Sequence, residues 1–406
     1  MELYFSSSYD KSDLFILQVP HSLLEDIEKN EELIIKGSNP TLLCSKDKGY
    51  ELKMLETSNT LLLLKDKENY EDKKDIILKT DHCIEATNIL PKKYYIYNLL
   101  KKFCLLNYDI STGQNNINSF KQIYSLEELF AMCDLPSKQF NELILETHIF
   151  KYNEEISCIF DFQFIINFIS DLLKGISITN KIFFDKIDNA ITLLPADSKF
   201  KNVINSMNES EKRNIIEYIA DISENDSVNL NVNKIKFLLA KSLFYSNKDG
   251  TKSELKLSNF ILLFNNVFAI YLPVDLSLEE SKKMNEYLST TNCEDNLYER
   301  YKEYDLRFLI GKCIIYQNKS YNEPLIKWID ISELSEKFED RITELFGIKN
   351  IWTMKEICYF LNDLELPNLQ DRILRLTRPI QEDNLFDKTK KNAAIYLKIN
   401  PYFKKK

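Results

Sequence analysis

A chain of 406 residues exceeds one ordinary small core and predicts two to four domains of about 100 to 150 residues each. Hydrophobic residues make up 44% of the chain and aromatic residues 12%, which is enough for packed cores and excludes global disorder. The net charge of −9 argues against broad nonspecific binding of nucleic acid by the chain as a whole.

The eight cysteines are scattered, and no two of them are closer than the 20 residues from Cys293 to Cys313. This spacing lacks the close cysteine pairs of a zinc site. Residues 1–13 contain no basic stretch followed by a long apolar one, and no run of about 18 apolar residues occurs in the chain. We therefore expect an intracellular, reduced protein that has no secretory signal, membrane span, metal or other cofactor.

Residues 14–64 contain five apolar runs of about strand length, separated by short polar stretches. Some runs are continuous, as from Leu61 to Leu64, which indicates that both faces of these strands are covered. A sheet this short needs another element or chain to bury both faces of its strands. Residues 65–88 dilute the apolar signal and predict a loop or an insertion. The predicted strands are residues 14–19, 32–37, 41–45, 50–55 and 60–64.

A helix-turn-helix unit begins at Ser125, which stands three residues before a glutamate, in the spacing of a capping box. Pro136 separates this first short helix from a second one over 139–146. Two strand-like runs, 149–152 and 156–160, then predict a hairpin. Helix, turn, helix and hairpin is the order of a winged helix, and an ordinary α+β fragment is the alternative.

The same pattern recurs more weakly downstream, so we predict winged helices in tandem. In the second unit, helices are predicted over 181–192, 210–222 and 234–245, with a strand at 228–232. A third unit begins with the apolar segment 257–268. Its predicted strands are 307–316 and 325–330, and its predicted helices are 332–346 and 353–363.

No catalytic constellation is found in the sequence. The three histidines, His21, His82 and His148, are far apart, and a loop residue beside a buried thiol explains the His82-Cys83 pair better than a metal site does. The segment 311–313, Gly-Lys-Cys, lacks the upstream glycine and the following serine or threonine of a phosphate-binding Walker motif. We therefore expect a protein that is not an enzyme.

Positive charge is concentrated at one end. From Arg372 onward, ten basic residues stand against three acidic ones, a net +7, which leaves −16 on the rest of the chain. Such clusters bind phosphates through charge and counterion release, although a solvated surface is the alternative for any charge run. The first three arginines recur every third residue, which would put them roughly along one side of a helix if residues 369–376 are helical. The candidate DNA-binding residues are Arg372, Arg375, Arg378, Lys388, Lys390, Lys391 and Lys404.

Two stretches carry a family resemblance. Residues 42–53, LLCSKDKGYELK, precede ETSNTLLL at 56–63, and RITELF at 341–346 precedes WTMKEI at 352–357. The first stretch looks like the LCS-x-DK-x-[YW]-x-LK and SN-x-LL signatures of the sister chromatid cohesion protein Dcc-one family. The second resembles that family's RF-x-x-LF and W-x-x-[ED]-D-I, with departures at Ile342 and at Glu356-Ile357. The segment 124–129, YSLEEL, also sits where the family has its first helix after a barrel.

The resemblance implies a heterotrimeric β-barrel, built from the N-terminal region of this chain, a small Ctf-eight subunit and the C-terminal tail of a large Ctf-eighteen subunit. It implies a non-catalytic subunit of an alternative clamp loader, similar to replication factor C, that acts in sister chromatid cohesion and DNA replication in the nucleus. The winged helices would contact the catalytic subunit of DNA polymerase epsilon and single- and double-stranded DNA. The sliding clamp would be reached only indirectly, because ATP hydrolysis belongs to other subunits.

The expected fold class is therefore α+β: a small N-terminal β-barrel domain that partner chains complete, followed by tandem winged-helix domains. Completion of a sheet by strands from a partner is β-augmentation. The expected domains are residues 1–95 for the barrel, 96–175 and 176–255 for two winged helices, and 256–406 for a third with its basic tail. The candidate barrel contacts are Leu43, Tyr50, Leu52, Leu61 and Leu63.

A second interpretation belongs to another class of protein. Winged helices with a basic end also fit a stand-alone DNA-binding regulator of transcription or chromatin. A stable, monodisperse protein with tight sequence-selective DNA binding and no strand-supplying partner would favour that function over a loader subunit.

Overall fold

The computed structural model describes residues 2–5, 14–37, 40–66, 73–89, 92–179, 181–245, 254–271, 306–316, 323–364, 366–380 and 396–399. The chain divides into two compact units, which are described separately below. The first unit comprises Met1–Tyr95 with Glu127–Glu146, and the second comprises Ile96–Leu126 with Thr147–Lys406.

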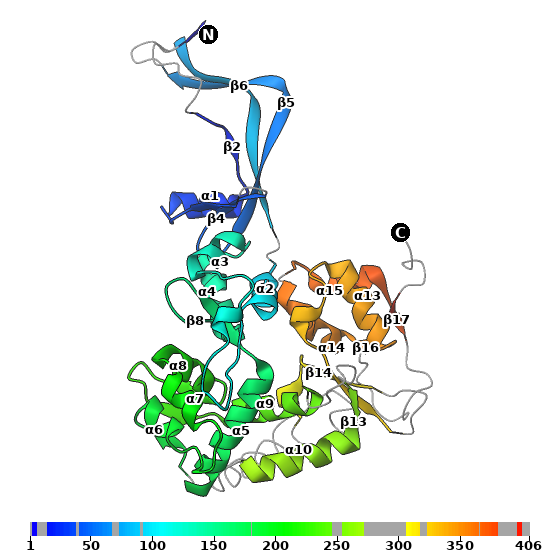
Figure 1. The fold of residues 1–406 in the computed structure, drawn as a ribbon. Coiled ribbons are helices and arrows are strands. Elements are labelled where there is room, and N and C mark those ends of the chain that lie inside the picture. Colours follow the sequence, from blue (N-terminus) through cyan, green and yellow to red (C-terminus); the bar gives the residue numbers. More distant parts are fainter. Residues whose placement is uncertain are drawn as a thin grey trace. The chain divides into compact units, whose positions relative to one another are not determined.

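The first unit contains a mixed sheet in the order β1-β6-β5-β4-β3, with β2 also beside β6 (Figure 1). β1 and β2 run parallel to β6, whereas the other neighbours are antiparallel. The described strands form an open sheet and not a closed barrel, so completion by partner strands stays a prediction. The strands are β1 Glu2–Phe5, β2 Leu17–Gln18, β3 Ile34–Lys36, β4 Thr41–Cys44, β5 Gly49–Asp66 and β6 Lys73–Asn88.

The loop predicted at 65–88 is wrong, because β6 occupies most of it. β5 and β6 form one long antiparallel hairpin whose register runs from Tyr50 opposite Asn88 to Asp66 opposite Lys74. The predicted strands 50–55 and 60–64 are parts of the single strand β5. Polar residues of β6 at 79–82 conceal the strand in the sequence, whereas backbone pairing with β5 establishes it.

A small core lies at the base of this hairpin. It joins Leu23, Leu43, Tyr50 and Ala86, and Val19, Leu33 and Leu52 pack against it. Leu23 comes from α1, His21–Glu28, a helix that the apolar runs did not predict. The Tyr50 ring is fully buried, and its hydroxyl lies 3.1 Å from Ser22 Oγ. Burial of the hydroxyl is tolerated because it has this hydrogen-bond partner.

The predicted helix-turn-helix is confirmed as α3, Leu126–Met132, and α4, Ser137–Thr147. Within the first unit, the buried Lys36 of β3 donates to Phe130 O at 3.1 Å and Leu135 O at 2.6 Å. Its ammonium also lies 3.9 Å from the centre of the Phe130 ring. A lysine at a helix C-terminus satisfies carbonyls that have no partner within the helix. Lys36 therefore fastens α3 to the sheet.

In the described chain that follows α1, one order of elements occurs four times: a helix, a strand, further helices and a two-strand hairpin. Each time the last strand lies between the other two, giving β7-β9-β8, β10-β12-β11, β13-β15-β14 and β16-β18-β17. The strands are β7 Leu105–Leu106, β8 Phe150–Lys151, β9 Ser157–Phe160, β10 Phe183–Phe184, β11 Ala220–Ile222, β12 Val228–Leu230, β13 Glu254–Lys256, β14 Cys313–Tyr316, β15 Leu325–Trp328, β16 Trp352–Thr353, β17 Thr377–Ile380 and β18 Tyr396–Ile399.

The helices that precede the four first strands are α2, α5, α9 and α13, and the remaining helices lie between the first strand and the hairpin. The α-helices are α2 Tyr95–Phe103, α5 Phe162–Thr179, α6 Ile187–Ile191, α7 Lys201–Ser206, α8 Glu209–Glu217, α9 Val232–Tyr245, α10 Leu257–Tyr271, α13 Phe338–Ile348, α14 Met354–Tyr359 and α15 Leu369–Leu376. The short 3-10 helices are η1 Ile117–Ser119, η2 Arg307–Leu309, η3 Ile331–Glu333 and η4 Asn362–Leu364.

The α+β class is confirmed, and several local predictions need correction. The helix predicted over 181–192 begins as strand β10, and the helix predicted over 210–222 ends at Glu217 and continues as β11. The strand predicted over 307–316 begins as η2. Residues 256–406 hold most of two recurring sheets, and their assignment to one winged-helix domain stays a prediction.

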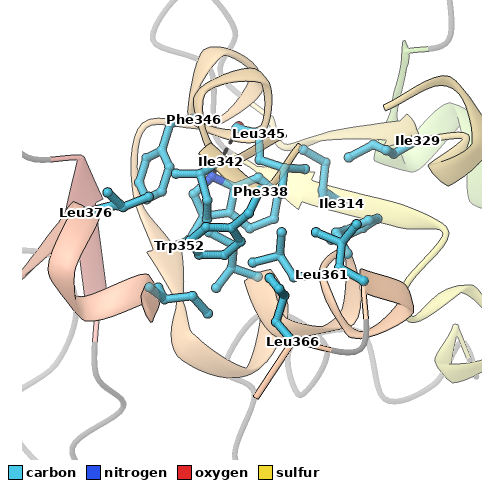
Figure 2. Close-up of a cluster of buried hydrophobic side chains, with 14 residues drawn as sticks. Ile314, Ile329, Phe338, Ile342, Leu345, Phe346, Trp352, Leu361, Leu366 and Leu376 are labelled. Carbon is cyan, nitrogen blue, oxygen red and sulfur yellow. Dashed lines mark hydrogen bonds between the residues drawn. The ribbon is translucent and has the colours of Figure 1, made fainter. Parts of the chain in front are cut away.

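Figure 2 shows the apolar core of the last recurring group, with Trp352 among the side chains of α13 and the segments around it. The Trp352 indole is fully buried and donates to Leu345 O at 3.2 Å. The second signature segment supplies much of this core through Ile342, Phe346 and Ile357. Thr353 and Glu356 of the same segment form a capping box at α14. The second signature segment therefore stabilises the fold of this group, because its residues form the core and cap a helix.

Candidate partner-binding strands

One long edge of β5 is free of strands among the described residues. β4 pairs with β5 only from Gly49 to Leu52, whereas β6 accompanies β5 on the other side as far as Asp66. The backbone from Lys53 to Asp66 thus has a ladder partner on one side only in the described part of the chain. An unpaired edge of this length is a template for another strand.

Apolar side chains follow this edge and remain accessible. Met54 is 62% exposed, Leu62 40% and Leu63 43%. Leu78 of β6 stands directly opposite Leu63 and is only 3% exposed. The hairpin thus buries Leu78 on β6, whereas Leu62 and Leu63 on β5 remain exposed to solvent. Large apolar side chains that stay exposed along one strand mark an interaction surface.

The hairpin changes register where the SN-x-LL signature lies. The pairing shifts between Glu56 and Leu61, and again between Leu63 and Leu64. Thr57 Oγ1 donates to Asn59 O at 2.6 Å and to Asp81 O at 3.0 Å, which ties the irregular segment across the two strands. Such bulges bend a hairpin and re-aim the side chains that follow. The bulge separates Met54 from Leu62 and Leu63.

The structure divides the five predicted barrel contacts into two groups. Leu43 and Tyr50 are buried in the core of the sheet itself, and Leu52 packs against that core. Leu61 is half-buried, and Leu63 is exposed on the hairpin. Partner contact in solution stays a prediction for all five, and the geometry makes Leu63 the one most open to a neighbouring chain.

Sequence reasoning missed Met54, Leu55, Leu62 and Ile35, which are all exposed on this sheet. Leu62 was hidden in a continuous leucine run, in which no alternation separates one strand face from the other. The signal at Met54 and Leu55 was present, since two large apolar residues stand between Lys53 and Glu56.

The predicted DNA-binding residues fall into separate places. Residues 369–376 form the helix α15, and Arg372 and Arg375 lie on it. Arg378 lies on β17 instead, so the three arginines do not share one helix. Arg375 and Arg378 are exposed, and Arg372 Nε donates to Pro367 O at 3.2 Å. The predicted contacts Lys388, Lys390, Lys391 and Lys404 lie outside the described residues.

The described residues contain no cluster of three or more histidine, cysteine or acidic side chains that could hold a metal ion. Nor does any described helix have the length and apolar character to cross a membrane. His21 forms an exposed pair with Glu25 at 3.0 Å, and His82 pairs with Asp81. His148 is half-buried, and the centre of its ring lies 3.8 Å from the centre of the Tyr218 ring, on which it stacks.

Burial lowers the pKa of His148 from its ordinary 6.5 to about 4, assisted by the positive charges of Lys234 and Lys241. Because the folded pKa lies below the unfolded one, this site stabilises the fold fully above pH 6.5 and loses that contribution as the pH falls toward 4. We expect the loss to be about 2 kcal/mol at pH 5.

The test compares urea unfolding at pH 7 and pH 5 for the unaltered chain and for His148→Asn, since asparagine tolerates the positive φ of 54°. The variant should lose less stability between the two pH values. The exposed His21→Asn should retain the dependence of the unaltered chain, and an equal dependence in His148→Asn would contradict the assignment.

The geometry defines a mixed α+β protein that combines an open strand edge bearing apolar side chains with a recurring arrangement of helices and three-stranded sheets. The family model described as "Sister chromatid cohesion protein Dcc1" matches residues 14–361. The chain therefore belongs to the Dcc1 family of sister chromatid cohesion proteins.

Relatives agree with the family model. The "Probable sister chromatid cohesion protein DCC1" of Dictyostelium discoideum is 24% identical over 394 residues, which cover 93% of each chain. The "Sister chromatid cohesion protein DCC1" of Xenopus laevis is 39% identical over 64 residues, which cover 15% of this chain and 16% of the relative. The protein of the same description from Danio rerio is 38% identical over 64 residues, with the same coverage.

Proposed function

We propose that this chain is a non-catalytic subunit of an alternative clamp loader, which it joins through its N-terminal sheet in the nucleus. The main observation is the edge of β5 beyond Leu52, which pairs with no strand among the described residues and along which Met54, Leu62 and Leu63 are exposed. Strands from a Ctf-eight and a Ctf-eighteen type subunit would pair with this edge, cover the leucines and complete a barrel. Family membership in sister chromatid cohesion supports this assignment.

The four recurring groups are proposed as winged-helix domains. A winged helix places one strand before its helices and a hairpin after them, with the last strand at the centre of the sheet. The observed sheet orders support that assignment for each group. These domains would link the loader to the catalytic subunit of DNA polymerase epsilon and to single- and double-stranded DNA, and through the loader to the sliding clamp.

The adaptor function is tested by co-expressing the full chain with its two barrel partners and measuring the mass of the purified complex. Met54→Asp combined with Leu63→Asp should abolish co-purification, because two carboxylates would be buried against partner strands without compensation. Leu145→Asp is the matched control: Leu145 is 71% exposed on α4 of the same unit. This control should leave the complex intact.

An intact complex carrying both aspartates would refute the β5 edge as the binding site. A monodisperse chain that ignores both partners and binds one DNA sequence tightly would indicate a stand-alone regulator instead. Circular dichroism of each variant separates loss of binding from loss of folding.

A further inference from the structure

Lys241, near the end of α9, lies among aromatic rings. Its ammonium is 4.6 Å from the centre of the Phe162 ring, 5.6 Å from that of Tyr245 and 5.9 Å from that of Trp328. Phe162 begins α5, Tyr245 ends α9 and Trp328 ends β15. The centres of the Phe162 and Tyr245 rings are 4.7 Å apart. Ring faces attract a cation, but they do not replace the hydrogen-bond acceptors that the lysine N–H groups have in water.

Lys241 Nζ has no hydrogen-bond or ion-pair partner within the part of the chain that the structure describes. The nearby carboxylates of Asp330 and Glu333 bind other groups. Asp330 accepts from the Ser332 N–H at 3.1 Å and from the Ser332 hydroxyl at 2.7 Å. Glu333 pairs with Lys101 at 2.7 Å. The Lys241 ammonium is therefore held between rings without a carboxylate of its own.

The surroundings of Lys241 disfavour its positive charge. Burial lowers the pKa of Lys241, and the positive charges of Lys101 and Lys312 act in the same direction, whereas Asp330 and Glu333 oppose them. Loss of hydration is thus the dominant electrostatic effect at this position. An apolar side chain of similar length would avoid that loss.

A second polar group without a partner belongs to Trp328. The side chain is 6% exposed, and its Nε1 is buried with no hydrogen-bond acceptor among the described residues. The Trp328 ring packs on Phe237 and Phe244 of α9, with centres 5.4 and 5.7 Å apart. A buried N–H without an acceptor is destabilising, and contact with water would remove that penalty.

Both groups lie where separate elements of the second unit meet. In this α2–η3 junction, residues 97–101 of α2 and the start of α5 contact the end of α9, β15 and η3. Asn98 Nδ2 donates to Ser332 O at 2.7 Å. The pair of Lys101 with Glu333 also crosses the junction, and both of its side chains are exposed by a third or more. Polar contacts near the surface therefore hold α2 against η3.

A different kind of contact joins the third and fourth recurring groups. Ile314 of β14 and Ile329 belong to the same apolar cluster as Phe338, Ile342 and Trp352 (Figure 2). Parting these two groups would expose apolar side chains to water, which is unfavourable. Parting the α2–η3 junction would instead hydrate an ammonium and an indole N–H.

We propose that the α2–η3 junction opens and closes reversibly while the groups on either side stay folded, and that Lys241 prevents the junction from staying shut. In the open form, water would solvate the Lys241 ammonium and Trp328 Nε1. Helix α5 also packs against α9 and α10, which would keep the two sides attached. The chain would thereby change the angle between its first and third groups without unfolding either one.

The indole N–H of Trp328 is a direct probe of this opening, because an N–H without an acceptor exchanges with solvent once water reaches it. Trp352, the other of the two tryptophans, is the internal reference. Its indole lies in the core of the fourth group and donates to Leu345 O at 3.2 Å and to Lys349 O at 2.8 Å. NMR of the full chain with isotope-labelled tryptophan measures both exchange rates, and Trp328→Phe identifies the two signals.

Lys241→Met should slow the exchange of the Trp328 N–H by about tenfold or more, because the methionine packs among the rings without losing hydration. The Trp352 rate should stay unchanged. Lys234→Met is the matched control on the same helix. Lys234 has partners, since it donates to Ala220 O at 2.7 Å and pairs with Asp221 at 2.8 Å. Its replacement should therefore leave the exchange of Trp328 no slower.

Asn98→Ala should speed the exchange of the Trp328 N–H by about threefold or more, because it removes the hydrogen bond to Ser332 O across the junction. Unchanged exchange in this variant would overturn the proposal, since water would then reach Trp328 by another route. Faster or unchanged exchange in Lys241→Met would also overturn it, as would equal slowing in Lys234→Met. A Lys241→Met chain that fails to fold would do the same, because the charge would then be required for the structure.

Discussion

Replacing Arg341 with methionine is expected to lower the free energy of unfolding by about 3 to 5 kcal/mol. The Arg341 side chain is 1% exposed, and its guanidinium donates to both Asp363 oxygens at 2.7 and 2.8 Å. It also donates to Ser335 O at 2.6 Å and to Phe360 O at 3.2 Å. The variant would leave a carboxylate and two carbonyls near the core without their donor.

Urea unfolding followed by the fluorescence of the buried Trp352 measures this effect. Adding Asp363→Leu should recover much of the loss, because an apolar pair replaces the unpaired charge. Lys101→Met is the control: Lys101 forms a 2.7 Å pair with Glu333 in which both side chains are exposed by a third or more. It should cost less than about 1 kcal/mol. Equal losses at both sites would contradict the structural role of Arg341.

Replacing Lys36 with methionine should release α3 from the N-terminal sheet at a cost of about 2 to 4 kcal/mol. The Lys36 ammonium donates hydrogen bonds to Phe130 O and Leu135 O, and it also lies 3.6 Å from Cys133 Sγ. Without it, the buried Leu135 O and the part-buried Phe130 O lose a charged donor, and only the weaker Cys133 thiol still donates to them. Hydrogen exchange of the α3 amides should rise well before the rest of the first unit opens.

Lys53→Met provides the comparison, since Lys53 is 53% exposed and pairs only with Glu51 among the described residues. This change should leave exchange in α3 unaltered. If Lys36→Met also left α3 protected, then α3 would be held by apolar packing alone and the lysine would be incidental to its position.

How far the candidate site could be predicted depends on the kind of signal each residue carries. Apolar runs identified the strands that hold Leu43, Tyr50 and Leu63, because strand composition is local. The same runs could not separate the buried Tyr50 from the exposed Leu63, since burial depends on α1 and β6, which lie far from them in the sequence. The long β5–β6 pairing was missed for a related reason: polar residues interrupt the apolar pattern of β6, and only its pairing with β5 shows that it is a strand.

The helices α15 and α8 also separate what the sequence predicts from what tertiary contacts decide. The spacing and charge of the arginines of α15 could be read from the sequence, because both depend on residues close together in the chain. The contacts of Tyr108, Lys151 and Tyr152 with the start of α8, Glu209–Glu217, could not, because these residues lie 56 or more positions away in the sequence. Local patterns therefore determined the α+β class, many of the elements and the basic end. Long-range packing alone decided which strand edge has no partner among the described residues and which side chains are buried against it.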